Sequence, residues 1–554
     1  MKSSTDQTTL TETSSTHSFL DSSRHWKTVK KGTCYIHRIG HEFSLNQIIE
    51  NLERVDGADA RVLGEILRKQ IGNFGVIIEN ANFILGFVDT IRSYPIFYAR
   101  EKEGMVISNS ARKVQDLAGL EKKNNIALLE FAMTGYVTGH ETVIQGVSQL
   151  QAGELLLWRK GNAEPVLERY FRYAPKEREI EKTVLMDRLF EITDQMFKRI
   201  IENAKGATIW VPLSGGLDSR LVLCKLKELG HDQLRAFSYG PAGNFEAEAA
   251  KHVAETLGVP WEFVQTPGKE ARRAFLAPER KQFQDMADGL SSVPVYNEFF
   301  VLSKFSREGK FSGNDMIVNG QTGDYLTGGH IPVTLMSGNP TVRTILDAII
   351  KKQYSVWKHL KTDSNHKVME NRILRIMKCS LEDSMCREEL ASKYESWEWQ
   401  ERQCKYVVNG QRIYDYLGLN WALPLWDLEY MEFWETVPMA LRFDQTLFRQ
   451  YLEKYDYKGL FKGYRSEARR WVGGIGIGVK VVDKLLTLSS LTKVKDRFLR
   501  DASYFGHYGN LYKLHGFSRF RKVIPRATVP PQARGVVALN IETWFRDNGV
   551  SQYV

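Results

Sequence analysis

Cysteine is scarce in this sequence of 554 residues. The five cysteines are scattered and form no Cys-x-x-Cys pair, which argues against a disulfide framework and against a zinc site. A reducing compartment such as the cytoplasm is therefore expected. Long apolar runs are also lacking, since none approaches the ~20 residues that span a bilayer, and no membrane insertion is expected. The cysteines are Cys34, Cys224, Cys379, Cys386 and Cys404.

Acidic residues are too few to balance the basic ones, and the formal net charge is +10. The excess is spread along the chain, and even its densest region, residues 462–526, contains no recognisable nucleic-acid motif. We interpret the charge as a solvated basic surface together with phosphate-bearing ligands, and we expect no nucleic-acid partner. Nucleic-acid binding stays an alternative that rests on charge alone.

The length of the chain exceeds what one hydrophobic core usually organises, so two domains are expected. Residues 1–24 are rich in Ser and Thr, lack the apolar stretch of a signal peptide and are predicted to form a disordered tail. Residues 25–175 show mainly short strand patterns separated by turn residues, which predicts a layered α+β domain. The expected strands cover residues 75–79, 83–88, 95–98 and 154–158, and helices are expected near 60–70 and 126–133.

Residues 176–554 alternate strand and helix patterns instead. Strands linked by helices imply an α/β domain with a parallel sheet covered on both faces, followed here by a helical, basic C-terminal extension. Such sheets bind ligands at the carboxyl ends of their strands. Strands are expected at 207–213, 235–239 and 261–265, and helices at 182–203, at 217–229 with a left-handed cap at Gly230, at 246–257, and over much of 332–408.

A glycine-containing hexapeptide, Ser-Gly-Gly-Leu-Asp-Ser at 214–219, joins the first of these strands to the next helix. Backbone N–H groups of such a turn and the positive end of the helix suit an anion, and Ser214 and Ser219 add hydroxyls. No Gly-Lys-Ser/Thr follows, so the loop is not a Walker A motif and suits pyrophosphate better than γ-phosphate transfer. Asp218 would repel phosphate unless a cation stood between them, which predicts a magnesium ligand.

The hexapeptide resembles the pyrophosphate loop of N-type ATP pyrophosphatases, and three later segments resemble the asparagine synthetase class among them. These segments are 237–248 on the adenine side, 319–329 with a second magnesium-binding aspartate at Asp324, and 423–427. The resemblance implies an adenine nucleotide α-hydrolase-like fold that uses ATP and Mg²⁺, with Asp218 and Asp324 as metal ligands and catalytic residues. It implies nucleotide binding by Ser214, Gly215, Gly216, Leu217, Asp218, Ser219, Tyr239, Asn319 and Gly320.

The first half resembles the glutaminase domain of the same family, an Ntn-hydrolase-like fold. The matching segments are 72–75, 89–98 and 139–153. A working glutaminase of this class needs an N-terminal cysteine, whereas this chain begins Met1-Lys2 and lacks the glutamine-binding Arg-Gly-Pro and Asn-Gly-Glu segments. We interpret Cys34 as structural, because a buried free cysteine commonly acts as a small hydrophobe, and the domain as degenerate.

The synthetase half departs from the family as well. Where asparagine synthetases carry Gly-Glu-Gly-x-Asp-Glu, this chain has Gln321 and Tyr325 in place of the two glutamates, which weakens aspartate as the acceptor. The family's lysine before a glycine-rich segment is also missing. Arg469 and Arg470 stand nearby and are predicted to neutralise the leaving pyrophosphate, with a purely surface role as the alternative.

The expected activity is that of an ATP-dependent amide-forming ligase that adenylates a small-molecule carboxylate, releases pyrophosphate and transfers ammonia or an amine. Three alternatives stay open: amidation of a uronic acid in surface-polysaccharide synthesis, an intramolecular cyclase of the β-lactam or lasso-peptide type, and a catalytically dead nucleotide-binding scaffold. A homodimer is possible. The sequence names neither the acceptor acid nor the nitrogen source.

Overall fold

The computed structural model describes residues 18, 20–21, 25–53, 59–101, 104–240, 245–266, 269–462, 522–523, 526–527, 531–551 and 553. Most of the predicted tail, as well as Arg469 and Arg470, lies outside these residues. The chain divides into two compact units, the first formed by Met1–Lys122 and His140–Phe171 and the second by Lys123–Gly139 and Arg172–Val554. Helix α4 (Asn125–Thr134) therefore groups with the second unit. The domain boundaries 1–24, 25–175 and 176–554 stay predictions.

Two antiparallel sheets form the first unit. A mixed cluster of buried side chains joins them, with Ile77, Ile84 and Leu156 from the larger sheet against Tyr98 and Ile107 from the smaller. The larger sheet has the order β1-β2-β3-β4-β8-β9 and the smaller β6-β5-β7. The strands are β1 (Lys27–Lys31), β2 (Cys34–Gly40), β3 (Phe74–Glu79), β4 (Phe83–Val88), β5 (Phe97–Arg100), β6 (Met105–Ser108), β7 (Ser148–Gln149), β8 (Glu154–Arg159) and β9 (Val166–Arg169).

Helices complete the layers of this unit. Helix α2 (Ala60–Leu67) contacts β8 and β9, α3 (Ala111–Leu117) contacts β5 and β6, and α1 (Asn46–Leu52) contacts α2. The predicted layered α+β arrangement is confirmed. The strand expected at 95–98 begins two residues later, because Pro95 has no N–H to donate to a ladder.

A buried turn leads into that strand. The carboxylate of Asp89 accepts backbone N–H bonds from Phe74 (2.7 Å), Ile91 (2.9 Å) and Ser93 (3.2 Å). Burial raises the pKa of Asp89 to about 6, although these N–H groups act in the opposite direction. Asp89 is thus a structural residue that fixes the turn.

Arg92 in the same turn has φ +56°, a left-handed conformation, at the position where the glutaminase-domain pattern Asp-x-x-Gly-x-x-Pro carries glycine. Its Nε donates to the Leu150 carbonyl (2.9 Å) and its Nη2 to Gln149 Oε1 (2.7 Å). Arg92→Ala and Arg92→Gly both remove these bonds, but only Gly relieves the backbone. We expect both to be destabilised, Ala by about 1 kcal/mol more than Gly, in thermal or urea unfolding. Equal stability of the two variants would show that the left-handed backbone costs nothing here.

The second unit contains a five-stranded sheet in which every neighbouring pair is parallel, in the order β12-β11-β10-β13-β14. The predicted parallel α/β domain is confirmed. Its strands are β10 (Ile209–Pro212), β11 (Leu234–Gly240), β12 (Trp261–Gln265), β13 (Met316–Val318) and β14 (Asn420–Ala422). Its helices include α5 (Lys182–Ala204), α6 (Leu217–Glu228), α7 (Phe245–Leu257), α8 (Lys269–Leu276), α9 (Pro278–Ala287), α10 (Asn297–Arg307), α11 (Gly323–Leu326), α12 (Val342–Gln353), α13 (Asp363–Met377) and α14 (Arg387–Trp397). Farther on come α15 (Arg412–Tyr416), α16 (Leu428–Thr436), α17 (Met439–Arg442), α18 (Thr446–Tyr455) and α24 (Pro531–Asp547).

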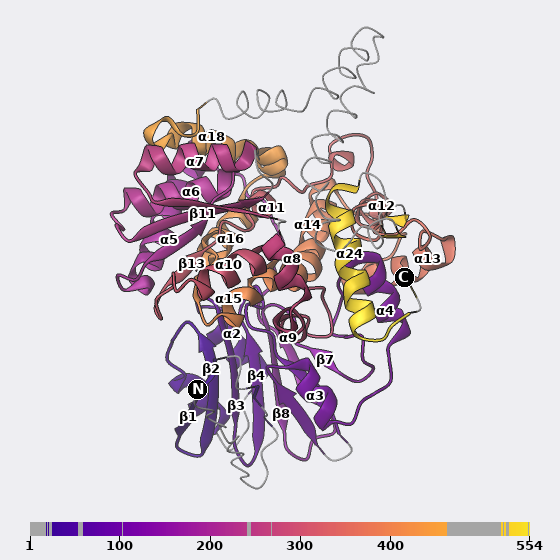
Figure 1. Cartoon of the computed structure of the whole chain (residues 1–554). Helices are drawn as coiled ribbons and strands as arrows, with labels where there is room; N and C mark the ends of the chain where they lie inside the picture. Colours follow the sequence, from indigo (N-terminus) through magenta and orange to yellow (C-terminus); the bar gives the residue numbers. More distant parts are fainter. Residues whose placement is uncertain are drawn as a thin grey trace. The chain divides into compact units, whose positions relative to one another are not determined.

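The order of this sheet reverses at β10. The chain passes from β10 outward to β11 and β12 through α6 and α7, whereas β13 and β14 lie on the other side of β10. Right-handed crossovers in opposite directions place the connecting helices on opposite faces of the sheet, and Figure 1 shows α6 and α7 on one side of it and α10 and α15 on the other. The point between β10 and β13 is a topological switch point, where ligands bind in open α/β sheets.

Two local details of this unit are notable. Gly230, after α6, has φ +83°, as the predicted left-handed cap requires. The helical stretch expected within 332–408 is confirmed, but its last part, Glu398–Val407, is a π-helix (η3) that the sequence pattern did not indicate. π-helical turns occur often at functional sites, and two residues of η3, Arg402 and Val407, line a cavity.

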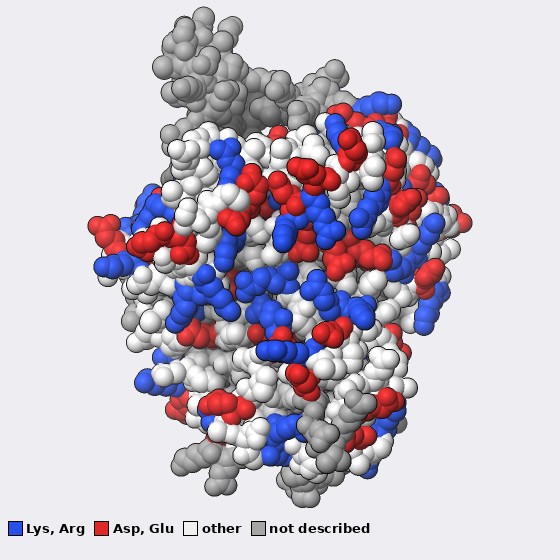
Figure 2. Space-filling model, turned by 180° about the vertical axis from the view of Figure 1, so that it is seen from behind, with Lys and Arg blue, Asp and Glu red and all other residues white. Residues whose placement is uncertain are grey.

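Charged side chains of both signs cover the face shown in Figure 2, where Lys and Arg lie among Asp and Glu. Among the described residues, no helix has the length and apolarity needed to cross a membrane.

Candidate active site

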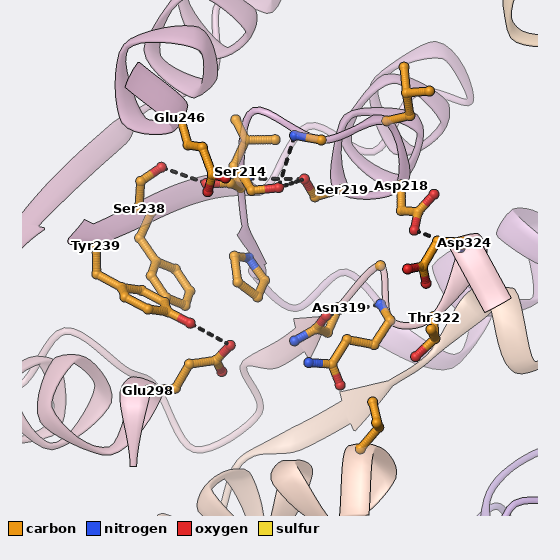
Figure 3. A pocket seen from close by; sticks show the side chains of 18 of the residues that line it. Ser214, Asp218, Ser219, Ser238, Tyr239, Glu246, Glu298, Asn319, Thr322 and Asp324 are labelled. Carbon is orange, nitrogen blue, oxygen red and sulfur yellow. Dashed lines mark hydrogen bonds between the residues drawn. The ribbon is translucent and has the colours of Figure 1, made fainter. Parts of the chain in front are cut away.

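A cavity of about 700 Å³ opens at the switch point of the parallel sheet. The loop after β10, the end of β11 and the loop after β13 form its walls, together with residues of α7, α10, η3 and α18. Figure 3 shows Ser238, Tyr239, Glu246 and Glu298 at one end and Asp218 and Asp324 toward the other. The ends of β10 and β13 therefore bring the two predicted loops, 214–219 and 319–329, into one cavity. These are called the signature loops below.

Eight of the nine predicted nucleotide-binding residues line this cavity. The exception is Gly215. A Cβ added at this position would lie 3.2 Å from the Cα of Glu246, which is a tight contact. Gly215 thus allows the loop to approach α7. The eight are Ser214, Gly216, Leu217, Asp218, Ser219, Tyr239, Asn319 and Gly320.

Hydroxyl groups shape the loop after β10. Ser219 Oγ accepts the N–H of Ser214 (3.0 Å) and lies 3.0 Å from Ser214 Oγ, which accepts the N–H of Gly216 (3.1 Å). Hydrogen bonds between the loop's own residues therefore hold its conformation. Gly216 is the N-cap of α6 and provides no side-chain cap, so the first N–H groups of this helix remain directed at the cavity as an anion site.

Asp218 and Asp324 meet across the cavity. Asp218 lies in the first turn of α6, Asp324 lies in α11, and the backbone N–H of Asp324 donates to Asp218 Oδ2 (3.1 Å; Figure 3). Burial and the neighbouring charge of Asp324 raise the pKa of Asp218 to about 7. Two carboxylates so close together are unfavourable as anions without a cation between them.

This pair fits Mg²⁺. That ion is commonly bound through one or two carboxylates, with water and substrate phosphates as the other ligands. The described residues contain no group of three or more His, Cys, Asp or Glu side chains arranged to hold a metal.

The two signature loops touch through glycine. A Cβ on Gly320 would lie 2.8 Å from the backbone nitrogen of Ser219, and one on Gly323 would lie 2.5 Å from Asp218 Oδ1. Both distances are shorter than real Cβ contacts allow. These glycines permit the close approach that joins Asp218 to Asp324.

A charge network centred on the buried Glu398, absent from the sequence-based prediction, stands behind Asp324. His330 lies between two carboxylates, with Nε2 3.2 Å from Asp324 Oδ2 and Nδ1 2.7 Å from Glu398 Oε1. Glu398, at the start of η3, also accepts from Lys352 Nζ (3.1 Å). The only sequence signal for His330 was its position directly after Gly328-Gly329, and nothing marked Lys352 or Glu398.

The charges in this network determine its protonation. Burial alone would raise the pKa of Glu398, but the charges of His330 and Lys352 hold it well below its usual value. Burial likewise lowers the pKa of His330, yet the charge of Glu398 and the bond to Asp324 more than compensate, and it is raised. The raised pKa favours the imidazolium form of His330, in which both ring nitrogens donate to the two carboxylates and hold Asp324 in place.

A partly buried carboxylic acid, Glu298 of α10, lies at the opposite end of the cavity. The hydroxyl of Tyr414 donates to its Oε2 (2.5 Å) and that of Tyr239 to its Oε1 (3.5 Å), while Asn319 Nδ2 donates to the Tyr414 hydroxyl (2.9 Å). Burial raises the pKa of Glu298 to about 7. Sequence reasoning missed Glu298 and Tyr414, which belong to no motif.

Glu298 predicts a pH dependence of stability. Between its unfolded pKa near 4.5 and its folded pKa near 7, the folded state holds the proton and the unfolded state does not, so rising pH lowers the free energy of unfolding. Glu298→Gln mimics the protonated acid and should weaken the fall in Tm between pH 5 and pH 8. A fall as steep as in wild type, measured by thermal unfolding, would show that Glu298 is ionised at neutral pH.

Gln321 and Tyr325, which stand where asparagine synthetases carry two glutamates, lie in different surroundings. Gln321 lines the cavity and its Oε1 accepts from Gln411 Nε2 (2.6 Å). Tyr325 is 1% exposed and its hydroxyl donates to the Glu395 carbonyl (2.5 Å), so it packs in the core. Nearby, Asp427 caps α16 by accepting the N–H of Glu429 (3.0 Å) and pairs with Arg199 (2.8 Å), which makes it structural.

A family model, but no curated protein, matches this chain. One similar solved structure is glutamine phosphoribosylpyrophosphate amidotransferase from B. subtilis complexed with ADP and GMP. The two sequences are 10% identical, and the match covers 47% of this chain and 74% of that chain with a TM-score of 0.15. The sequence model of asparagine synthase matches residues 207–487, which include both signature loops and make up just over half of the chain. The protein belongs to the asparagine synthase family.

Proposed function

We propose that this protein adenylates a carboxylic acid with ATP and converts the acyl-adenylate to an amide. The observation that carries the proposal is the meeting of Asp218 and Asp324, which are 106 residues apart in the sequence, at the switch point of the sheet. A nucleotide placed there would direct its phosphates to the N-terminus of α6 and its base toward Tyr239 at the end of β11.

The reaction has two steps. A carboxylate oxygen of the acceptor attacks the α-phosphorus of ATP, the bond from this phosphorus to the bridging oxygen breaks, and pyrophosphate leaves with the electron pair. The lone pair of ammonia or an amine then attacks the acyl carbon, the bond to the AMP oxygen breaks, and the nitrogen loses a proton. The N–H groups at the start of α6 stabilise charge on the leaving pyrophosphate.

Asp218 and Asp324 would hold Mg²⁺, which neutralises phosphate charge when bound. His330 orients the Asp324 carboxylate through the bond from its Nε2 (3.2 Å). Arg469 and Arg470 lie outside the described residues, and their proposed contact with pyrophosphate rests on their position before Gly473-Gly474.

The nitrogen source is proposed to be free ammonia, ammonia made elsewhere or an amine of the substrate. Cys34 supports this view, because its thiol is fully buried within the β1–β2 hairpin and burial raises its pKa, so it is a poor nucleophile. Glutamine hydrolysis by the first unit is not expected.

Three kinds of acceptor remain in competition. Aspartate is the family default, a uronic acid is the non-amino-acid alternative, and an intramolecular cyclase would carry acid and amine on one substrate. Gln321 disfavours aspartate because an amide cannot take a proton from ammonia. The rival reading, a catalytically dead nucleotide-binding scaffold, has no use for two facing carboxylates.

Pyrophosphate release tests the proposal. Purified protein is incubated with ATP, Mg²⁺ and ammonium and a panel of aspartate, glutamate, uronic acids and nucleotide-linked uronic acids. Release that depends on one acid and on ammonium, with AMP and amide formed in equal amounts, is the expected result. Tight ATP binding without release for any acid, including candidate cyclisation substrates, would favour the scaffold.

A further inference from the structure

Two arginines line the cavity on the Asp324 side. Arg402 projects from the π-helix η3, four residues after Glu398, whose carboxylate holds His330 against Asp324. Arg449 projects from α18, one turn after Gln445, which donates to Thr327 Oγ1 (2.8 Å) just beyond α11. Both arginines thus come from elements that contact the segment around Asp324, η3 through Glu398 and His330 and α18 through Gln445.

These arginines retain capacity to bind a ligand. Among the described residues, the acid that pairs with Arg402 is Glu398 at 3.8 Å, a carboxylate already bound by His330 and Lys352. Arg449 donates from Nη2 to Asp444 (3.4 Å), while its Nε is buried without a hydrogen-bond partner in the described part of the chain. A guanidinium carries five N–H donors, so each has several left for an anion.

The carboxylates at the Asp324 end of the cavity already have binding partners. The acidic residues that line the cavity are Asp218, Asp324, Glu246 and Glu298, and the last two lie beside Tyr239 at the nucleotide end (Figure 3). Glu398 is 0% exposed. In the described part of this end, Asp218 and Asp324 are the carboxylates that line the cavity, and once they hold Mg²⁺ an ammonium group on the acceptor would meet two guanidinium groups and no other counter-ion.

We propose that the acceptor acid carries a second anionic group, a carboxylate or a phosphate, that Arg402 and Arg449 bind, and that it carries no ammonium group beside it. This inference rests on the proposed function and narrows its substrate class. Amino acids such as aspartate are thereby disfavoured, while dicarboxylic acids and phosphorylated sugar acids fit. Arg402, which lines the cavity, and the buried Glu398 both belong to the π-helix η3.

Matched acids test the inference through kcat/KM for pyrophosphate release. Succinate differs from aspartate only by the ammonium group and from butyrate by the second carboxylate, and glucuronate 1-phosphate differs from glucuronate by the phosphate. We expect the dianionic member to be preferred by at least ~10-fold in the pair whose size fits, since charge-assisted bonds to Arg are strong. Preference for aspartate over succinate, with neither phosphate nor second carboxylate improving turnover, would overturn the inference.

Variants of the two arginines test whether these residues cause the preference for a dianionic acid. Arg402→Gln and Arg449→Gln should raise the KM of the preferred dianionic acid by ~10-fold or more and leave the KM of ATP unchanged. Arg343→Gln, which alters an arginine of α12 that pairs with Glu370 (2.6 Å), is the matched control. Equal KM values for the two cavity variants and this control would also overturn the inference.

Direct binding separates this inference from the proposed reaction. The same acids are titrated into protein loaded with Mg²⁺ and an ATP analogue whose α,β-bridge cannot be cleaved. Dianion binding that depends on Arg402, without pyrophosphate release from ATP, would support the subsite and contradict the ligase. Release without selective dianion binding would do the reverse, and absence of both would contradict both.

Discussion

Asp218→Asn is expected to reduce pyrophosphate release by about 100- to 1,000-fold while leaving the protein at least as stable as wild type. The asparagine keeps an oxygen that accepts the N–H of Asp324, so the loop contact of 3.1 Å is retained. What it removes is a charge that the proposed metal needs. The loss should appear in kcat with any acid that supports the reaction.

Stability is the more distinctive part of this prediction. The pKa of Asp218 is about 7 in the folded state and near 3.8 when unfolded, so between these values only the folded state holds the proton, and its free energy of unfolding falls as pH rises. The substituted amide does not titrate, and in the absence of metal the variant should have an equal or higher Tm at pH 8. Added Mg²⁺ and ATP should raise the Tm of wild type much more than that of the variant.

Asp232→Asn provides the control, because Asp232 is 84% exposed and lies after the other end of α6. Its activity and its response to Mg²⁺ and ATP should equal those of wild type. Retained turnover in Asp218→Asn would remove Asp218 from the catalytic machinery. A Tm well below that of wild type would mean that the carboxylate is needed for folding.

Local sequence patterns predicted the part of the site that depends on one strand and its following loop. Ile209–Pro212, the hexapeptide and α6 follow one another without interruption, so periodicity and glycine placement were sufficient. The second loop was found through its resemblance to the family's second signature, and the structure shows that Asn319 directly follows a strand, β13. Parallel strands then bring both loops to the same edge, which explains why Asp218 and Asp324 meet.

The same reasoning could not find the residues that support these carboxylates. His330, Lys352 and Glu398 come from three separate segments, and each looks like an ordinary polar residue in its own segment. Their burial and pairing exist only after the helices of the second unit have packed. The π-helix was equally hidden, because Glu398–Val407 has a composition compatible with an α-helix that continues α14.

Gly215 shows a limit of motif reasoning of another kind. The motif assigns all six loop residues to the nucleotide, yet Gly215 faces the Cα of Glu246 at a distance of 3.2 Å from its virtual Cβ. A glycine motif indicates where a side chain would be crowded. It does not say whether the crowding comes from a ligand or from the protein backbone. Whether ligand or backbone requires a glycine can also be asked of Gly320, where the structure gives a testable answer.

Gly320→Ala is expected to lower both stability and activity. The added methyl group would lie 2.8 Å from the nitrogen of Ser219 and 2.9 Å from the carbonyl carbon of Asp218, both of which are backbone atoms that no side-chain rotation can remove. The loops must therefore separate. We expect a destabilisation of about 1–3 kcal/mol from the overpacked contact, measured by thermal or urea unfolding.

The effect of this substitution on catalysis should be larger than its effect on stability. Separating the loops moves Asp218 away from Asp324, and a displacement of ~1 Å in a positioned catalytic group can cost ~100-fold in rate. Gly313→Ala is a close control, because it adds the same methyl group shortly before β13 at a place where nothing lies within 4 Å. If Gly320→Ala turned over as fast as Gly313→Ala, the close approach of the two signature loops would not be a requirement for pyrophosphate release. A loss of activity confined to Gly320→Ala would instead assign this glycine to holding the metal-binding carboxylates together, in addition to any contact with nucleotide.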